Sequence, residues 1–205
     1  MVYYPICLNL KDKKCVVVGG GEVAFRKVKS LLEAQSNVTI ISPEINLSLK
    51  ELVKKNKVTY LNQEYKSEYI EKDTFLVIAA SNNKRLNAKI AKDANKSNLL
   101  INVVDSPKLC NFIVPATFHR GKLIISVSTS GQSPTLARKI KEDLQNIYGV
   151  EYEILVDLLG KLRTEVQAKY KDEESRRLFW ENLVNSDLIE YITSKSPVVI
   201  CQEKK

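Results

Sequence analysis

Short apolar segments alternate with amphipathic segments along the first hundred residues, and this pattern predicts the elements of that part of the chain. We expect five strands, at 14–18, 38–41, 58–61, 75–80 and 99–104. We expect helices at 22–35, at 47–55 and from a cap at Asn82 or Asn83 to about residue 96. Strands that alternate with helices pair in parallel through right-handed crossovers. The pattern therefore predicts an α/β fold around a parallel sheet, and it leaves the strand order open.

The pattern changes in the second half of the chain. Two apolar segments, at 112–117 and 123–129, predict a β-hairpin. Ser133 predicts the cap of a helix over 134–148, because a proline follows it in the first helical position. From Val150 onward the apolar residues recur at helical spacing, which predicts a helical C-terminal region.

Three consecutive glycines, Gly19, Gly20 and Gly21, stand between the first predicted strand and the first predicted helix. With Ala24 they form the pattern G-x-G-x-x-A. In it Gly19 permits the tight turn, Gly21 lets the backbone approach a pyrophosphate and Ala24 lets the helix lie close to the sheet. The N–H groups at the helix start would face the phosphates. The pattern predicts a dinucleotide site, and the alternative is a glycine-rich turn that binds nothing.

The end of the second predicted strand bears on which dinucleotide binds. An acidic residue at this place usually binds the adenosine ribose. Glu44 stands two or three positions later than usual, so it either reaches the ribose or stabilises the start of the next helix. No arginine stands beside Ser42 to bind a 2′-phosphate, and this favours NAD over NADP.

Length and composition are typical of a globular protein. The chain has 205 residues, 44% of them hydrophobic, which is enough for one large domain or two small ones. No apolar run approaches the ~18 residues of a membrane span. The first residues lack the pattern of a signal peptide, so we expect a cytoplasmic protein that does not enter membranes. The four cysteines form no C-x-x-C motif, so we expect reduced thiols, with Cys15 buried in its strand, and no metal site.

The formal net charge is +8, which favours an anionic partner. Lysines are spread along the whole chain and no arginine-rich arm is present, as expected for a solvated surface. We therefore do not expect nucleic acid as a partner, and a small polycarboxylate is a better candidate.

Four stretches of the chain carry a resemblance to a known family. They are PICLNL at 5–10, VVGGGEVAFRK at 17–27, NVVDSPKLCNF at 102–112, and VSTSGQSP at 127–134 with Leu136-Ala137-Arg138. Their sequences, order and separations resemble the precorrin-2 dehydrogenase family, the NAD-dependent part of siroheme synthases. The resemblance covers residues 1 to about 145, and the helical region beyond it carries no motif of the family.

The resemblance implies a fold, a reaction and an assembly. The implied fold is a Rossmann-like NAD-binding domain over 1–112, a small dimerisation segment of a strand pair and a helix over 113–148, and a helical domain over 149–205. The implied reaction is the oxidation of precorrin-2 to sirohydrochlorin in siroheme biosynthesis, with a hydride passing to NAD⁺. The implied assembly is a homodimer. Some members of the family also insert Fe²⁺, whereas free-standing bacterial members often carry out the oxidation alone.

The resemblance also assigns site residues, position by position. The residues assigned to the cofactor are Gly19, Gly21, Glu22, Val23, Pro43, Glu44, Ala80, Ser81 and Asn82. Pro43 and Glu44 would lie beside the adenosine ribose, and the last three would lie toward the nicotinamide. The residues matched to a serine-rich loop near the tetrapyrrole are Ser128, Thr129, Ser130 and Gly131. Some members of the family have a serine in place of Thr129.

Asp105 and His119 are the candidates for proton transfer. Asp105 matches an aspartate that is important in the family and follows the fifth predicted strand, at the edge where α/β sheets bind ligands. Its carboxylate would accept a proton or orient the macrocycle, and the alternative is a turn cap before Pro107. His119 is the only histidine, and its place at the predicted hairpin tip favours a surface role over substrate binding.

Precorrin-2 carries eight carboxylates, which would give the positive charge of the chain a partner. The basic residues near the matched serine-rich loop are Arg120, Lys122, Arg138 and Lys139. Each is a candidate to pair with a substrate carboxylate, and the alternative for each is a solvated surface position.

Three functional hypotheses follow from these observations. The first is an NAD-dependent precorrin-2 dehydrogenase, and the second is a bifunctional enzyme that also acts as a sirohydrochlorin ferrochelatase. The third, from a different class, is a regulatory module that senses NAD(H). The chain shows no recognisable DNA-reading motif, which speaks against the third hypothesis.

Overall fold

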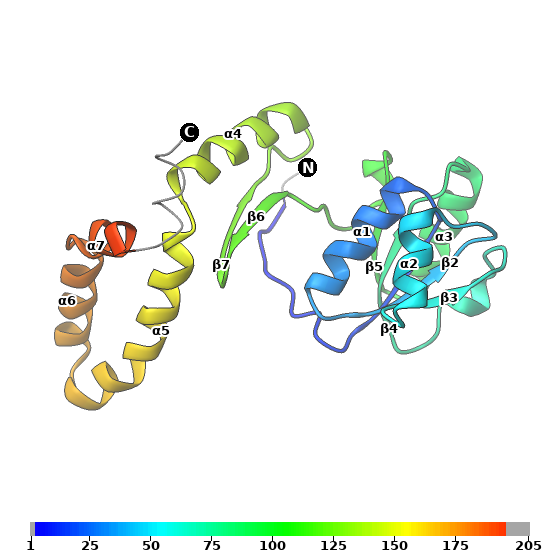
Figure 1. Ribbon diagram of the computed structural model, residues 1–205. Helices are drawn as coiled ribbons and strands as arrows, with labels where there is room; N and C mark the ends of the chain where they lie inside the picture. Colours follow the sequence, from blue (N-terminus) through cyan, green and yellow to red (C-terminus); the bar gives the residue numbers. More distant parts are fainter. Residues whose placement is uncertain (1–2, 196–205) are drawn as a thin grey trace. The chain divides into compact units, whose positions relative to one another are not determined.

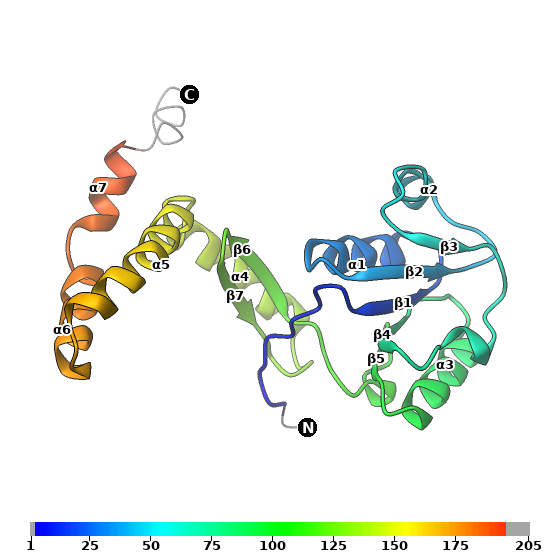
Figure 2. The ribbon, with the colours of Figure 1, turned by 90° about the horizontal axis from the view of Figure 1, so that it is seen from below.

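The structure is a computed structural model that describes residues 3–195 (Figures 1 and 2). The chain divides into two compact units, residues 1–114 and residues 115–205. The end of the predicted helical region, 196–205 with Cys201, lies outside the described residues.

The first unit is built around a five-stranded parallel sheet with the order β3-β2-β1-β4-β5. Its strands are β1 (Lys14–Val18), β2 (Asn37–Ile41), β3 (Thr59–Leu61), β4 (Thr74–Ala79) and β5 (Leu100–Val103). Its helices are α1 (Glu22–Glu33), α2 (Leu47–Lys54) and α3 (Lys84–Lys96), with 3-10 turns η1 (Ser67–Tyr69) and η2 (Pro107–Leu109). The predicted α/β fold is confirmed, and the predicted elements of this unit agree with the observed bounds to within two residues.

Both faces of the sheet are buried, which explains why its central strands are almost entirely apolar. In β1, Cys15 and Val17 pack in the core beneath α1 and α2, and Val16 and Val18 pack in the core beneath α3. Figure 2 shows α1 and α2 on one side of the sheet and α3 on the other. Side chains of a strand alternate between its two faces, so a strand covered on both sides is apolar at every position. Cys15 is fully buried, as the sequence predicts.

The second unit is a hairpin followed by helices. The hairpin strands are β6 (Ala116–Arg120) and β7 (Leu123–Val127), and the helices are α4 (Pro134–Ile147), α5 (Glu151–Lys169), α6 (Glu173–Val184) and α7 (Leu188–Lys195). The predicted cap of α4 is confirmed, because the hydroxyl of Ser133 accepts a hydrogen bond from the N–H of Leu136 at 3.2 Å. Asn83, one of the two predicted caps of α3, caps that helix in the same way through Leu86.

The first strand of the hairpin was placed wrongly by the sequence pattern. The predicted strand 112–117 is observed at Ala116–Arg120, so His119 and Arg120 belong to β6 and the turn consists of Gly121 and Lys122. The apolar residues 112–114 belong instead to the first unit. The side-chain amide of Asn102 in β5 donates a hydrogen bond to the carbonyl of Phe112 at 3.2 Å. A local pattern cannot separate an apolar strand from an apolar segment that is tied to a distant one.

None of the helices between residues 3 and 195 combines the length and the apolar composition that crossing a bilayer requires.

Candidate functional site

The candidate site lies at the carboxyl ends of the strands, where the connections from β1 and β4 run in opposite directions. The strand order places β1 and β4 side by side at the centre of the sheet, with β2 and β3 on one side and β5 on the other. The crevice at such a point of reversal is the place where open α/β sheets bind their ligands. The segments that follow β1, β2, β4 and β5 all border this crevice.

A cavity of about 850 Å³ opens there, within the size range of pockets for small molecules and cofactors. It is lined by Gly19, Gly20, Gly21, Glu22, Val23, Ser42, Glu44, Ile45, Asn46, Ala80, Ser81, Asn82, Lys84, Asn87, Val104, Asp105 and Ser106. Eight of the nine predicted cofactor residues are among them, and so is Asp105. The ninth, Pro43, does not line the cavity, and its carbonyl lies 3.4 Å from the hydroxyl of Tyr60.

The glycine turn after β1 lines this cavity, and each glycine has a different constraint. Gly19 has a φ of +129° and a Cβ there would overlap the carbonyl of Ala80. A Cβ on Gly20 would overlap the carbonyl of Glu44, so this position also excludes a side chain. A Cβ on Gly21 would meet no atom within 4 Å. The open space beside Gly21 is therefore room for a ligand, in contact with bare backbone.

The start of α1 supplies donors to that space. Gly21 is the N-cap of α1 and makes no side-chain cap, and its carbonyl accepts the hydrogen bond of Phe25 at 3.0 Å. The N–H groups of the first turn consequently have no partner within the helix. Together with the positive end of the helix dipole they form a site for an anionic group such as a pyrophosphate. Ala24 is fully buried against the sheet, as the sequence predicts.

The side of the cavity next to β2 is acidic. Glu44 lines it, and the carboxylate of Glu22 accepts a hydrogen bond from the amide of Asn46 at 3.4 Å. Asn46 also caps α2 by accepting from the N–H of Leu49 at 2.9 Å. Burial and then the charge of Glu44 raise the pKa of Tyr60, whose hydroxyl donates to the carbonyl of Ser42 at 3.0 Å. Two carboxylates at this place suit the hydroxyl groups of a ribose and repel a phosphate.

Asp105 lies on the opposite side of the cavity, two residues after the end of β5. Its φ is +57°, a left-handed conformation that is uncommon for residues other than glycine. Its side chain is exposed, and among residues 3–195 the carboxylate takes part in no hydrogen bond or ion pair. The turn after it is held by other groups, since the N–H of Ser106 donates to Val103 and the thiol of Cys110 donates to Ser106. The alternative role of Asp105 as a turn cap finds no contact to support it.

The remaining predicted site residues belong to the second unit. In the loop after β7, the hydroxyl of Ser128 accepts from the N–H of Ser130, and the hydroxyl of Thr129 accepts from the N–H of Ser133. Ser130 and Gly131 have positive φ values of 53° and 83°. These bonds order the loop from within, and they leave the side chain of Ser130 free of any partner in the described part of the chain.

Of the four basic candidates, three are already paired inside the second unit. Arg120 donates to the carbonyls of Tyr148 and Gln145 at the end of α4, at 2.9 and 3.1 Å. The other two pairs are Lys122 with Asp157 and Lys139 with Asp143. Arg138 is exposed and has no ion pair within residues 3–195.

His119 has an exposed side chain in β6 and lies opposite Ile124, next to the pair of Arg120 and Leu123 that closes the hairpin turn. Among residues 3–195 no three His, Cys, Asp or Glu side chains lie close enough together to hold a metal ion.

Several residues of the cavity were missed by the sequence analysis. Gly20 is as tightly constrained as Gly19, although the fingerprint treats its position as variable. Asn87 and Lys84 reach the cavity from the first turns of α3, and no motif marks them. Lys84 is the only basic residue among those that line the cavity. Asn87 and Lys84 could have been predicted from the general rule that a helix following a parallel strand begins at the edge of the sheet where ligands bind.

The fold and the cavity together define a nucleotide-binding protein of the doubly wound α/β class. A family model described as "Putative NAD(P)-binding" matches residues 6–116, more than half of the chain. The chain therefore belongs to this NAD(P)-binding family. Two further models match the second unit: "Sirohaem biosynthesis protein central" over 120–147 and "Sirohaem synthase dimerisation region" over 151–196.

Relatives with known names support the same assignment. The chain is 37% identical to the siroheme synthase of Vesicomyosocius okutanii over 95% of its length, and 38% identical to that of Pseudoalteromonas translucida over 92%. It spans only about two fifths of the length of these relatives, 41% and 40%. A solved structure, "SirC, precorrin-2 dehydrogenase", matches with a TM-score of 0.77 and 25% identity, over 98% of this chain and 96% of that one. These matches confirm the family resemblance found in the sequence.

The two models on the second unit divide it differently from the sequence analysis. The dimerisation model covers 151–196, whereas the sequence analysis placed the dimerisation segment at 113–148 and a helical domain at 149–205. The assignment of dimer contacts within the second unit stays a prediction.

Proposed function

We propose that this protein is an NAD-dependent precorrin-2 dehydrogenase, which oxidises precorrin-2 to sirohydrochlorin in siroheme biosynthesis. The observation that carries the proposal is the cavity at the sheet edge. It combines a bare-backbone cradle at Gly21 with the carboxylate of Asp105, which has no partner among residues 3–195, on the opposite side. The nearly complete overlap with a solved precorrin-2 dehydrogenase supports it.

The reaction removes two hydrogens from the macrocycle, one as a hydride and one as a proton. Bound NAD⁺ supplies the hydride acceptor. The proton needs a base, and the carboxylate of Asp105 is exposed and not neutralised by any partner among the described residues. We assign to Asp105 the acceptance of this proton or the orientation of the ring nitrogens, and we assign the eight lining residues predicted from the sequence to the cofactor.

NAD is preferred to NADP on electrostatic grounds. The pyrophosphate belongs at the start of α1, so the adenosine ribose falls on the β2 side, beside Glu44 and Glu22. A 2′-phosphate there would meet two carboxylates, and the basic residue of the lining, Lys84, starts α3 on the β4 side. The nicotinamide end then lies toward Ala80–Asn82 and Asp105.

The proposal extends to partners. We propose a homodimer, with the second unit supplying the dimer contacts, and a substrate whose carboxylates meet Arg138 and the loop Ser128–Gly131. Of the basic residues named from the sequence, Arg138 alone lacks a partner within residues 3–195. We expect the protein to work in the cytoplasm, where the free thiols of Cys7 and Cys110 would stay reduced.

The decisive experiment follows the two products at once. Purified protein with precorrin-2 and NAD⁺ should produce sirohydrochlorin, seen in the visible spectrum, and NADH, seen at its own absorbance, in equal amounts. NADP⁺ at the same concentration should support a rate at least about tenfold lower, which corresponds to ~1.4 kcal/mol of discrimination.

Two other outcomes would contradict the proposal. Tight binding of NAD(H) with an unchanged tetrapyrrole would indicate the sensor hypothesis. The absence of any affinity for either cofactor would remove the basis of the site. A further arm adds Fe²⁺ to sirohydrochlorin with and without protein, and an acceleration by the protein would show that it also acts as a ferrochelatase.

A further inference from the structure

The loop between β4 and α3, residues 80–83, lies next to the glycine turn, and Ala80, Ser81 and Asn82 line the cavity. The N–H of Ala80 donates to the carbonyl of Val18 at 2.8 Å, and a Cβ on Gly19 would overlap the carbonyl of Ala80. The two loops therefore touch backbone to backbone. A displacement of the peptide that joins Ala80 and Ser81 would also displace the turn that cradles the ligand.

One buried side chain of α3 makes three hydrogen bonds to this loop. Asn87, one turn into α3, is only 5% exposed although its side chain is polar. Its Oδ1 accepts from the hydroxyl of Ser81 at 2.7 Å and from the N–H of Ser81 at 3.3 Å, and its Nδ2 donates to the carbonyl of Ser81 at 2.9 Å. One amide thus binds all three polar groups of Ser81.

This network also fixes the orientation of the Asn87 amide. If oxygen and nitrogen were exchanged, an oxygen would face the Ser81 carbonyl and an NH₂ group would face the Ser81 N–H. Both contacts would then be repulsive, so only one orientation satisfies the buried groups.

The hydroxyl of Ser81 is consequently committed. Its one proton faces two acceptors, Oδ1 of Asn87 at 2.7 Å and the carbonyl of Asn83 at 3.3 Å, and the hydroxyl accepts from the N–H of Asn83 at 3.2 Å. Asn83 in turn caps α3 through Leu86. Ser81 therefore offers no free donor to a cofactor, and its contribution to the site is the position of its backbone.

We propose that Asn87 is a positioning residue of the active site, which holds the Ser81 backbone where the nicotinamide end of the cofactor must lie. This inference rests on the proposed function for its catalytic part, because the β4 side of the cavity is the nicotinamide side only if NAD binds with its pyrophosphate at α1. The three hydrogen bonds between Asn87 and Ser81, which we call the clamp, do not depend on that assignment. Hydride transfer demands close alignment, and a displacement of about 1 Å can lower the rate about 100-fold.

The test uses Asn87→Ala with Asn95→Ala as a matched control, since Asn95 is an exposed asparagine on the same helix. The first readout is amide hydrogen exchange of the full-length protein without cofactor. Exchange in residues 80–83 should rise at least about tenfold in Asn87→Ala and stay unchanged in Asn95→Ala. Unchanged exchange in both variants would overturn the clamp, whatever the activity of the enzyme.

The second readout separates positioning from binding. For Asn87→Ala we expect kcat to fall roughly 10- to 100-fold, with the dissociation constant of NAD⁺ within about threefold of the wild type. Faster exchange with an unchanged kcat would overturn the positioning role and leave the proposed function intact. A wild type that binds NAD⁺ without turning over precorrin-2 would instead refute the proposed function.

The variant Asn87→Asp provides a rescue that a purely structural role would not show. An ionised aspartate keeps the acceptor for Ser81 but turns a negative oxygen toward the Ser81 carbonyl, whereas a protonated one can donate there as asparagine does. The activity of Asn87→Asp relative to wild type should therefore rise as the pH is lowered from 8 to 5. A ratio that is constant over this range would contradict the role of the donated hydrogen bond.

Discussion

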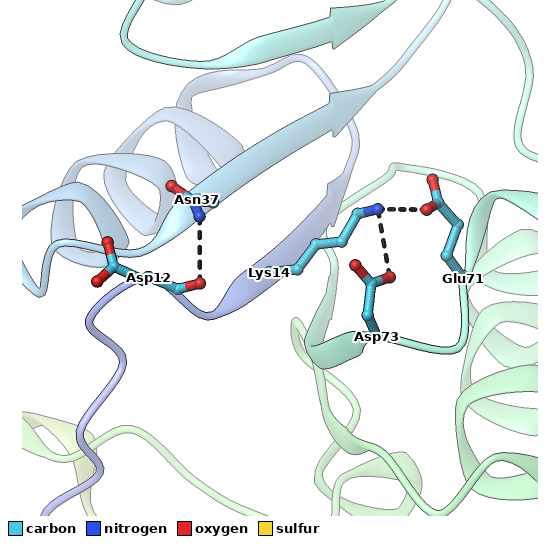
Figure 3. Close-up of polar contacts among 5 residues, drawn as sticks. All are labelled: Asp12, Lys14, Asn37, Glu71 and Asp73. Carbon is cyan, nitrogen blue, oxygen red and sulfur yellow. Dashed lines mark hydrogen bonds and ion pairs between the residues drawn. The ribbon is translucent and has the colours of Figure 1, made fainter.

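The two edges of the parallel sheet treat their charged groups in opposite ways. At the amino ends of the strands, the ammonium of Lys14 pairs with the carboxylates of Glu71 and Asp73, and the amide of Asn37 donates to the carbonyl of Asp12 at 3.1 Å (Figure 3). At the carboxyl ends, Asp105 has no such partner among the described residues. Both edges have charged side chains next to exposed backbone, so composition alone does not distinguish them.

The difference lies in what satisfies the polar groups. At the amino edge these side chains pair with other groups of the chain, and the pairs join the starts of β1, β2 and β4. At the carboxyl edge the first N–H groups of α1 and the carboxylate of Asp105 stay unpaired around an open cavity. Polar groups that converge on an open cavity without a partner in the chain are available to a ligand, and this is what distinguishes the carboxyl edge. Perturbing the two edges should accordingly affect folding and chemistry to different degrees.

The largest expected effect is that of Gly20→Ala on the fold of the first unit. The new methyl group would overlap the carbonyl of Glu44, and the N–H of Asn46 donates to the Gly20 carbonyl at 2.9 Å, so neither segment can move away freely. We expect a loss of at least about 3 kcal/mol in the free energy of unfolding, at the upper end for overpacking. Urea denaturation followed by circular dichroism measures it.

Gly21→Ala is the matched control, because its methyl group would enter the open space of the cavity. Its unfolding free energy should stay within about 1 kcal/mol of the wild type, while its affinity for NAD⁺ falls at least about tenfold. If both variants lost stability equally, the assignment of a structural role to Gly20 and a ligand-binding role to Gly21 would be wrong.

The next effect concerns catalysis at the carboxyl edge. Asp105→Asn keeps the shape of the side chain and tolerates the left-handed backbone, since asparagine is the residue other than glycine most at ease there. Loss of the carboxylate should lower kcat at least about 100-fold, the usual range for a general base. The dissociation constant of NAD⁺, measured by the fluorescence of NADH in competition, should change less than threefold. A variant with normal turnover would remove Asp105 from the mechanism.

The sequence predicts which residues lie at the carboxyl edge of the sheet better than it predicts the contacts that hold them in place. Strand, glycine turn and helix follow one another along the chain, so the local pattern predicted the tight turn at Gly19 and the burial of Ala24, and the structure confirms both. It also predicted a ligand at Gly21, where the structure has open space. Glu44 was assigned from the dinucleotide fingerprint and Ser81 from the family resemblance, and both residues line the cavity.

Other features depend on contacts between distant segments, which no local pattern encodes. The strand order places β4 between β1 and β5 and could not be derived from periodicity. The constraint on Gly20 comes from Glu44, and the role of Asn87 arises because α3 docks beside the end of β4. Pairing inside the second unit likewise commits Arg120 to the end of α4, whereas its sequence position left open a substrate contact or a solvated surface position.

A smaller effect is expected on cofactor choice at the β2 side of the cavity. Glu44→Gln preserves size and removes one of the two carboxylates there, so a 2′-phosphate is repelled less. The ratio of the dissociation constants of NADP⁺ and NAD⁺ should fall by about fivefold to tenfold, or ~1 kcal/mol. Glu51→Gln, on the exposed face of α2, should leave the ratio unchanged. Equal ratios in all three proteins would indicate that the acidic side of the cavity does not face the ribose.

The smallest effect is expected at the amino edge, where Lys14→Met removes the ammonium and keeps the apolar stem. A partly exposed ion pair contributes at most about 1 kcal/mol, so the loss in unfolding free energy at pH 7 should not exceed this, and NAD⁺ affinity should not change.

The hydrogen bond to Glu71 raises the pKa of Lys14 in the folded state above its ordinary value of 10.5. A raised folded-state pKa means that the folded protein holds the proton more tightly than the unfolded chain does. The contribution of the pair is therefore complete below pH 10.5 and is lost as the pH rises through the higher folded-state value. The stability difference between wild type and Lys14→Met should shrink above pH 10.5. The variant Lys92→Met, which removes an exposed lysine of α3 without a partner among residues 3–195, should show no such trend. A difference for Lys14→Met that stays constant with pH would assign its contribution to packing of the stem rather than to charge.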